Sequence, residues 1–270
     1  MRRFLRMISA QRRLLLGTLL GALPSRLPAA LRSPVGAEER VVALGSSTVR
    51  LVLQGPADAA IVFINLHENE STSVLAARDV LGPQPAQRLV ELRGQGRRLV
   101  AFRIGARPFL FDPNRIFSDQ GIERTLRFHG HYALDAHAAV AGLRDAIIDA
   151  LQLGRSKAII ALHNNGSGSY TLNSYLPGAE FAAEAAAVHL PATADPGDFF
   201  LVTQQSAYNA LADSRFGVVL QHAEPDDDGS MSTRYQGPRP LYINVEARHG
   251  HRQQQRAMLQ LLLSRMDRLI

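Results

Sequence analysis

The hydrophobic pattern from residue 41 onward alternates short apolar runs with longer helix-like stretches. Residues 47–54 (STVRLVLQ) alternate with period two, as expected for a strand with one buried face. Continuous apolar runs at 59–66 and 157–165 are typical of strands that are covered on both faces. Further strand candidates cover residues 97–104, 198–203, 216–221 and 241–247. The pattern therefore predicts a sheet assembled from segments that are far apart in the sequence.

Helix-like stretches separate these strand candidates. Residues 71–81 stop at Gly82-Pro83, an amphipathic stretch covers 132–151 and ends near Gly154, and a closing helix is expected at about 252–269. Strands connected by helical crossovers indicate an α/β sandwich, with helices on both faces of a mixed, mostly parallel sheet. We therefore predict a three-layer α/β fold.

Ionisable side chains follow or end three of the strand candidates. These are His67, His163 and Glu246. Ligands in open α/β sheets bind beyond the carboxyl ends of the strands, so one cleft could collect all three side chains. Burial of such groups without partners is costly, so we expect a metal ion, a substrate or an ordinary salt bridge to accompany them.

Composition limits the chemistry of any metal site. The chain has 270 residues and no cysteine, so a metal must be held by His, Asp or Glu, which favours zinc or a similar divalent ion. The formal charge of +6 is concentrated at the start, because residues 1–37 hold seven arginines and no acid. Subtracting these seven charges leaves −1 for residues 38–270. A nearly neutral body argues against a nucleic-acid partner.

The first 37 residues have the layout of a bacterial export signal. Arginines precede the apolar stretch 14–23, and a segment rich in proline and alanine follows it. The pair Arg12-Arg13 resembles a twin-arginine signal. The apolar stretch is about half the length of a membrane-spanning helix, so a cleaved leader is favoured over a permanent anchor, with an uncleaved interfacial helix as the alternative. We expect a hydrolase domain at 38–270 in the periplasm or another extracytoplasmic compartment.

The spacing of His67 and Glu70 suits one metal ion. Two residues three apart in a turn after a strand can chelate one ion, and His163 would add a third ligand while leaving one coordination position open. A single His-x-x-Glu pair is a weak signal, however. His67 could equally be a hydrogen-bonded histidine at the end of a strand.

Four segments in order strengthen the metal interpretation: HENE at 67–70, RPFLFDPNRIF at 107–117, LHNNGSGSYTL at 162–172 and INVEA at 243–247. Together they resemble the succinylglutamate desuccinylase and aspartoacylase branch of the zinc carboxypeptidase superfamily. That branch has H-G-N-E, an arginine seven residues before the asparagine of D-x-N-R-x-F, then D-L-H-N, and a glutamate at the end of a late strand. The resemblance implies a zinc-carboxypeptidase-like sandwich.

The resemblance also implies a role for each matching residue. One zinc ion would be bound by His67, Glu70 and His163. Glu246 would act as the general base towards the attacking water, and Arg107 would stabilise the oxyanion. A substrate carboxylate would be held by Asn114 and Arg115. These roles agree with the chemistry of carboxylates as proton acceptors and of guanidinium groups as forked donors to oxyanions.

Simpler interpretations stay open for individual residues. Arg115 could pair with Asp112 or Asp119 on a surface loop, and Asn114 could cap a turn. Glu246 could form a structural ion pair with Arg248.

The chain also departs from the family pattern. Glu68 stands where the family has glycine, so the turn must accept a side chain, or Glu68 itself faces the cleft. Only 24 residues follow Glu246, which leaves no length for the C-terminal β-rich domain of the aspartoacylase branch. We therefore expect a more open cleft, which favours a peptide-sized substrate.

These observations favour an exported zinc hydrolase of an amide or peptide bond in a small substrate with a free carboxylate. A carboxypeptidase or amidase that acts on cell-wall peptides is the preferred form. One alternative is a deacylase of N-acyl amino acids, and a second is a zinc-binding module without catalytic activity. No stable membrane span is expected after processing.

Overall fold

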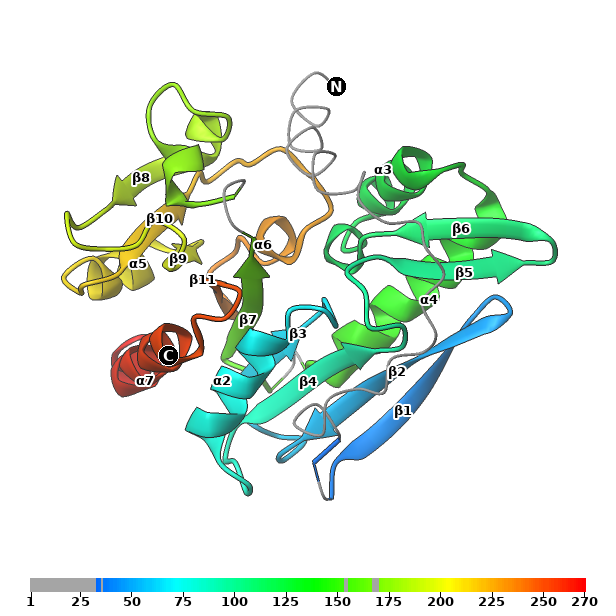
Figure 1. Cartoon of the computed structure of the whole chain (residues 1–270), viewed down its shortest axis with the longest axis horizontal. Helices are drawn as coiled ribbons and strands as arrows, with labels where there is room; N and C mark the ends of the chain where they lie inside the picture. Colours follow the sequence, from blue (N-terminus) through cyan, green and yellow to red (C-terminus); the bar gives the residue numbers. More distant parts are fainter. Residues whose placement is uncertain (1–32, 35, 153–154, 167–169) are drawn as a thin grey trace.

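A nine-stranded sheet forms the centre of the described part of the chain (Figure 1). The computed structural model describes residues 33–34, 36–152, 155–166 and 170–270. The strand order is β1-β2-β4-β3-β7-β11-β9-β10-β8. The strands are β1 (Glu38–Leu44), β2 (Ser47–Gln54), β3 (Ile61–Asn65), β4 (Arg88–Arg93), β7 (Ala158–Asn165), β8 (Ala185–His189), β9 (Phe199–Val202), β10 (Gly217–Gln221) and β11 (Leu241–Arg248).

Parallel pairing is concentrated in the middle of the sheet. Strands β4, β3, β7 and β11 run parallel, whereas β1 and β2 on one side and β9 on the other pair antiparallel with their inner neighbours. All eight residues of β7 are buried, which explains why this segment reads as a continuous apolar run rather than an alternating one. Because the four central strands run parallel, their carboxyl ends lie at the same end of the sheet.

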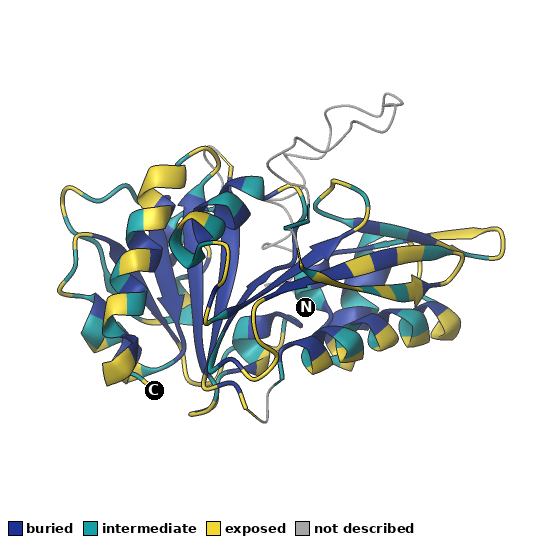
Figure 2. Cartoon of the chain, turned by 90° about the horizontal axis from the view of Figure 1, so that it is seen from below, coloured by how far each residue is buried: buried dark blue, intermediate teal, exposed yellow. Residues whose placement is uncertain are grey.

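Helices cover both faces of the sheet. On one face lie α2 (Ser71–Leu81), α5 (Gln205–Leu211) and α7 (Arg252–Arg265), and on the other lies α4 (Leu134–Ala150). Ala76 and Met258 pack in one core cluster, and Val140 and Leu143 in the other. Figure 2 shows the buried strands between these two partly exposed helical layers. The predicted three-layer α/β fold with a mixed sheet is confirmed.

A hairpin departs from the predicted sheet. Residues 97–104 were predicted as one strand, but strand β5 covers only Val100–Ile104 and pairs with β6 (Arg107–Phe111) in a separate two-stranded sheet. Phe102 packs on Phe109 and Phe111, which holds the hairpin together next to α3 (Asp119–His129). Residues 94–99 form the loop that connects β4 to this hairpin.

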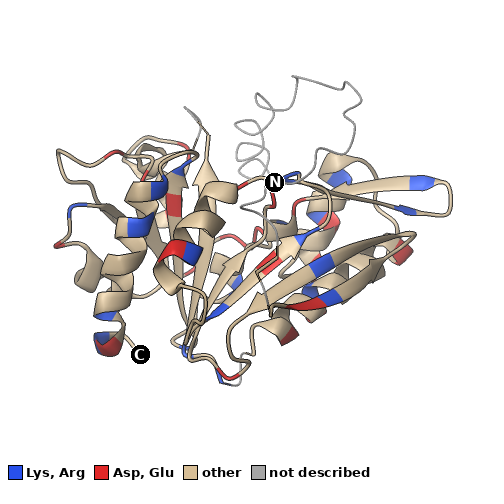
Figure 3. Ribbon diagram, turned by 60° about the horizontal axis from the view of Figure 1, so that its bottom comes forward, with Lys and Arg blue, Asp and Glu red and all other residues tan. Residues whose placement is uncertain are grey.

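Short helical turns complete the described chain. They are η2 (Pro113–Arg115), η3 (Leu172–Tyr175), η4 (Ala182–Glu184), α6 (Met231–Arg234) and η5 (Met266–Arg268). Acidic and basic side chains are interspersed along the outer helices and the β1–β2 hairpin (Figure 3), where Arg40 pairs with Glu38 and Arg50 with Glu39.

The predicted leader at 1–37 lies outside the described residues, apart from 33–34 and 36–37. None of the helices in the described ranges combines the length and the apolar character that crossing a membrane requires.

Candidate metal centre

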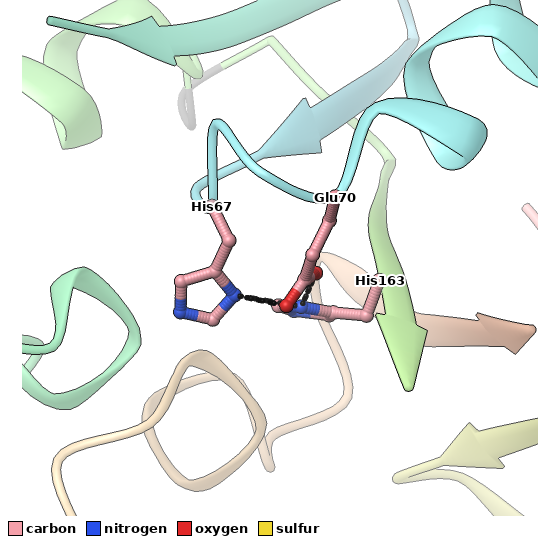
Figure 4. Close-up of side chains that lie close together, drawn as sticks. All are labelled: His67, Glu70 and His163. Carbon is pink, nitrogen blue, oxygen red and sulfur yellow. Dashed lines mark hydrogen bonds and ion pairs between the residues drawn. The ribbon is translucent and has the colours of Figure 1, made fainter. Parts of the chain in front are cut away.

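Three side chains meet at the carboxyl ends of β3 and β7 (Figure 4). His67 follows β3, Glu70 immediately precedes α2, and His163 belongs to β7. The Nδ1 atom of His67 lies 2.9 Å from Glu70 Oε1, and the Nδ1 atom of His163 lies 3.0 Å from Glu70 Oε2. The two Nδ1 atoms are 3.3 Å apart. All three side chains are buried, so the structure brings together the three predicted ligands.

The turn between β3 and α2 fixes Glu70. The backbone N–H of Glu70 donates to the carbonyl of His67, and the Ser73 hydroxyl donates to the carbonyl of Glu70. The backbone N–H of Asn164 donates to Glu70 Oε2 at 3.0 Å, while the Asn164 side chain accepts from the N–H of Ser73. These bonds join the start of α2 to β7, which ties Glu70 to the strand that carries His163.

The donor set fits a zinc ion. Two imidazole nitrogens and one carboxylate oxygen lie within 4.8 Å of one another. Bonds of about 2.0–2.1 Å in a tetrahedral site separate neighbouring ligand atoms by about 3.3 Å. The separations of 2.9–3.3 Å between the side-chain atoms of His67, Glu70 and His163 are close to that spacing. Three protein ligands would leave a fourth position open to water or substrate, as in catalytic zinc sites.

Asp112 orients His67, which the sequence did not reveal. The Nε2–H group of His67 donates to Asp112 Oδ1 at 2.8 Å, because a carboxylate can only accept. This bond leaves the Nδ1 lone pair facing Glu70 and the candidate metal position. Burial alone would raise the pKa of Asp112, but Arg98 and His67 hold it well below its usual value.

Replacing Asp112 with asparagine should lower zinc affinity by about 10–100-fold, because such supporting carboxylates fix the tautomer of a ligating histidine. The pKa of Asp112 is lower in the folded than in the unfolded chain, so its stabilisation is present above the ordinary value of 3.8 and is lost as the pH falls through the folded value. Denaturant titrations of the metal-free protein should show that the difference in free energy of unfolding between wild type and Asp112→Asn becomes smaller as the pH falls below 3.8. A gap that is constant with pH, together with unchanged zinc affinity, would contradict this role.

The structure corrects the prediction for Arg107. Its side chain is 54% exposed and pairs with Asp135 at the start of α4, and it does not line the cavity next to the candidate metal centre. The reason is that β6 is extended, so the five steps along the chain from Arg107 to Asp112 span on the order of 15 Å. The seven-residue spacing from Arg107 to Asn114 therefore does not bring this guanidinium to the site.

Arg98 is the guanidinium at the metal centre. It projects from the 94–99 loop and donates through Nη1 to Glu70 Oε1 at 2.5 Å and through Nη2 to Asp112 Oδ2 at 3.3 Å. It also lines the large cavity described below. The motifs that carry the family resemblance do not include residues 94–99, so they gave no signal for Arg98.

Asn114 and Arg115 both line the cavity from η2. Asn114 Oδ1 accepts from the N–H of Met231, and its own N–H donates to Asp112 Oδ1. Arg115 pairs with Asp228 at 3.2 Å, rather than with the acidic partners considered from the sequence. The two residues thus stand where a ligand in the cavity could reach them.

Glu246 lies beside His163. The two residues are register partners in the parallel pair β11–β7. The Asn244 amide donates to Glu246 Oε1 at 3.2 Å, and burial raises the pKa of Glu246 above its ordinary value. Arg248 pairs with Asp195 instead, so the structural pairing of Glu246 with Arg248 is not formed. A carboxylate with a raised pKa in a cavity is suited to accept a proton.

A cavity of about 760 Å³ connects these residues. Glu70, His163 and Glu246 line it near the metal centre, and Tyr175, Phe181 and Leu201 line an apolar part of it. This volume is within the range of sites that bind small molecules.

Comparisons with known proteins give structural neighbours only. No family model and no curated protein matches the sequence. A candidate metallopeptidase from Shewanella amazonensis shares 11% identity and a TM-score of 0.41, over 98% of this chain and 92% of that one. An ectoine utilization protein from Ruegeria pomeroyi shares 14% identity and a TM-score of 0.40, over 90% and 70% of the chains. An aspartoacylase family protein from Mesorhizobium loti shares 13% identity and a TM-score of 0.36, over 85% and 66%.

The chain is similar to metallopeptidase and aspartoacylase-family structures. Because all three TM-scores lie below 0.5, we base the functional proposal on the geometry of the site.

A second group of possible ligands in the described ranges consists of Asp195, Asp198 and His251. Its acidic groups already have partners, since Asp195 pairs with Arg248 and Asp198 accepts from the Arg248 N–H and from His251. None of these three residues lines the cavity of about 760 Å³, and we assign no metal site to them.

Proposed function

We propose that this protein is a zinc-dependent hydrolase that cleaves an amide or peptide bond in a small substrate with a free carboxylate. The observation that carries the proposal is the position of Glu246, a buried carboxylate in register with His163 that lines the same cavity as the candidate ligands His163 and Glu70. A binding module would need the ligands but would have no use for a proton acceptor at this point. The combination is that of a hydrolytic metal site.

Each residue has a task that follows from its chemistry. A zinc ion held by His67, Glu70 and His163 would polarise the scissile carbonyl and lower the pKa of water. Glu246 would take the proton from the attacking water and pass it to the leaving amine. Arg98, in place of Arg107, would donate to the developing oxyanion.

The carboxylate of the substrate would bind at η2. Arg115 offers a forked set of N–H donors in the cavity, and the amide of Asn114 lies next to it. Arg115 already pairs with Asp228, so a substrate carboxylate would share or replace that partner.

We further propose that the protein is exported and acts on cell-wall peptides. The support is the arginine-rich and leucine-rich pattern of residues 1–37 and a cavity that extends beyond the metal centre to Tyr175 and Phe181. A deacylase of N-acyl amino acids would use the same groups on a smaller substrate.

Metal analysis and a matched substrate panel test the proposal. The purified protein should contain one zinc ion per chain, and activity should disappear with a chelator and return with zinc. The panel compares cell-wall stem peptides, the same peptides with C-terminal amides, and N-acetyl and N-succinyl amino acids. Turnover of the free-acid peptides alone supports the peptidase. Turnover of only the N-acyl amino acids would replace it by the deacylase, and zinc binding without any turnover would leave a binding module.

A further inference from the structure

Glu68 binds three consecutive backbone N–H groups of another segment. Its Oε2 atom accepts from Gly94, Gln95 and Gly96 at 2.9, 2.7 and 2.5 Å. Successive N–H groups that converge on one anion form a nest, and hydrogen bonds to an ionised acceptor are stronger than those between neutral groups. Glu68 thus does not face the cleft; it anchors the 94–99 loop to the turn that carries His67 and Glu70.

The 94–99 loop is closed by a second set of contacts. The Gln95 side chain accepts from the N–H of Ala101 at 2.9 Å and donates to the carbonyl of Ala101. Gly96 has a φ of +63°, a conformation that side-chain-bearing residues rarely adopt. The backbone of the loop is therefore held at Glu68 and at the start of β5.

Arg98 follows this anchored backbone by two residues. An arginine side chain has many rotamers, so its position at a site depends on where its backbone is held. From the 94–99 loop, Arg98 reaches Glu70 and Asp112, the two carboxylates that contact His67. Glu68 therefore holds the backbone of the 94–99 loop, and this loop carries the Arg98 guanidinium that contacts the candidate metal centre.

We propose that Glu68 is a positioning residue that acts through Arg98. By anchoring the 94–99 loop it keeps a guanidinium on Glu70, where the positive charge opposes an incoming cation and limits metal affinity. The same placement would aim Arg98 at the oxyanion, and this second part rests on the proposed function. The first part concerns metal binding alone and can be tested separately.

A double-mutant cycle on zinc affinity tests the first part. Metal-free wild type, Glu68→Ala, Arg98→Ala and the double variant are titrated with zinc against a chromophoric chelator. Removing the cation next to the site should tighten zinc binding by about tenfold in Arg98→Ala. Glu68→Ala should tighten binding in the wild-type background but change it less than about twofold in the Arg98→Ala background, as expected for coupled residues. Arg107→Ala, which removes an exposed charge from β6, should leave affinity unchanged.

The cycle also separates positioning from general damage. If Glu68→Ala changes zinc affinity equally in both backgrounds, or in neither, the proposal is overturned. Circular dichroism and urea titration check that each variant is folded. Should Glu68→Ala not fold, Glu68→Gln takes its place, because it keeps the side-chain length but removes the negative charge that strengthens the three hydrogen bonds to the loop.

Turnover provides the second readout. On a substrate identified by the panel above, Arg98→Ala should lower kcat by about 10²–10³-fold, the usual cost of losing one oxyanion donor. Glu68→Ala should lower kcat in the wild-type background and have no further effect in the Arg98→Ala background. Additive losses would overturn the positioning role. If no substrate is turned over, the proposed function fails, while the zinc cycle still decides whether Glu68 acts through Arg98.

Discussion

Replacing His163 with alanine should abolish tight zinc binding. The His163 ring supplies one of three candidate donor atoms and sits 3.0 Å from Glu70, so the variant keeps only two protein ligands. The loss should exceed the roughly 100-fold that removal of an outer supporting group costs. Zinc content after dialysis against a chelator, and the rise of Tm on adding zinc, are the two measurements. Zinc should raise the Tm of the wild type and not that of the variant, because a ligand stabilises only the state that binds it.

His137 provides a matched control for this experiment. It lies on α4, where it contacts Tyr132 and Asp119 rather than the metal centre. His137→Ala should bind zinc as the wild type does. Retention of one zinc ion per chain by His163→Ala with wild-type affinity would remove the basis for the metal centre.

Replacing Glu246 with glutamine should leave zinc binding intact and lower the hydrolysis rate by about 10²–10⁴-fold, the usual contribution of a general base. Glutamine keeps the shape and the hydrogen bond with Asn244 but cannot accept a proton at neutral pH. Zinc titration and steady-state kinetics on the same preparation separate the two effects. Unchanged kcat in a zinc-loaded variant would exclude Glu246 as the base.

Glu246→Gln should also raise the stability of the metal-free protein at neutral pH. Burial raises the pKa of Glu246 above 4.5, its ordinary value. The stabilising contribution of this group is therefore fully present below the unfolded pKa and is lost as the pH rises through the folded pKa. Metal-free Glu246→Gln should have a larger free energy of unfolding than the wild type near pH 7. This difference should disappear when the pH falls below 4.5, the ordinary pKa of a glutamate. Urea titrations at a series of pH values measure the difference, and a less stable variant at pH 7 would contradict the raised pKa.

The sequence predicted the elements that depend on local pattern. Apolar runs at 59–66 and 157–165 became β3 and β7, because strands covered on both faces are built mainly from apolar residues. Their parallel pairing then brought His67 and His163 to the same edge. The positions of both candidate ligands were predictable because a side chain at a strand end is located by the point where the apolar run stops.

The supporting residues were not predictable in the same way. Asp112 contacts His67 although the two residues are 45 positions apart in the sequence, and Arg98 contacts Glu70 over a separation of 28 positions. No local periodicity encodes such contacts, because they depend on how the β5–β6 hairpin folds back over the site. Arg107 was misplaced for the related reason that a fixed spacing along the chain becomes a short distance in a turn and a long one in a strand.

The parallel pairing of β7 and β11 has a consequence for how this protein could change. The backbone ladder sets the distance between Glu246 and His163, whereas part of the cavity wall comes from a separate segment, residues 226–230. A slip of one residue in the ladder would turn either side chain to the opposite face, so the reactive pair tolerates no insertion. The wall, in contrast, can be redesigned or diversified to accept new substrates without touching the chemistry.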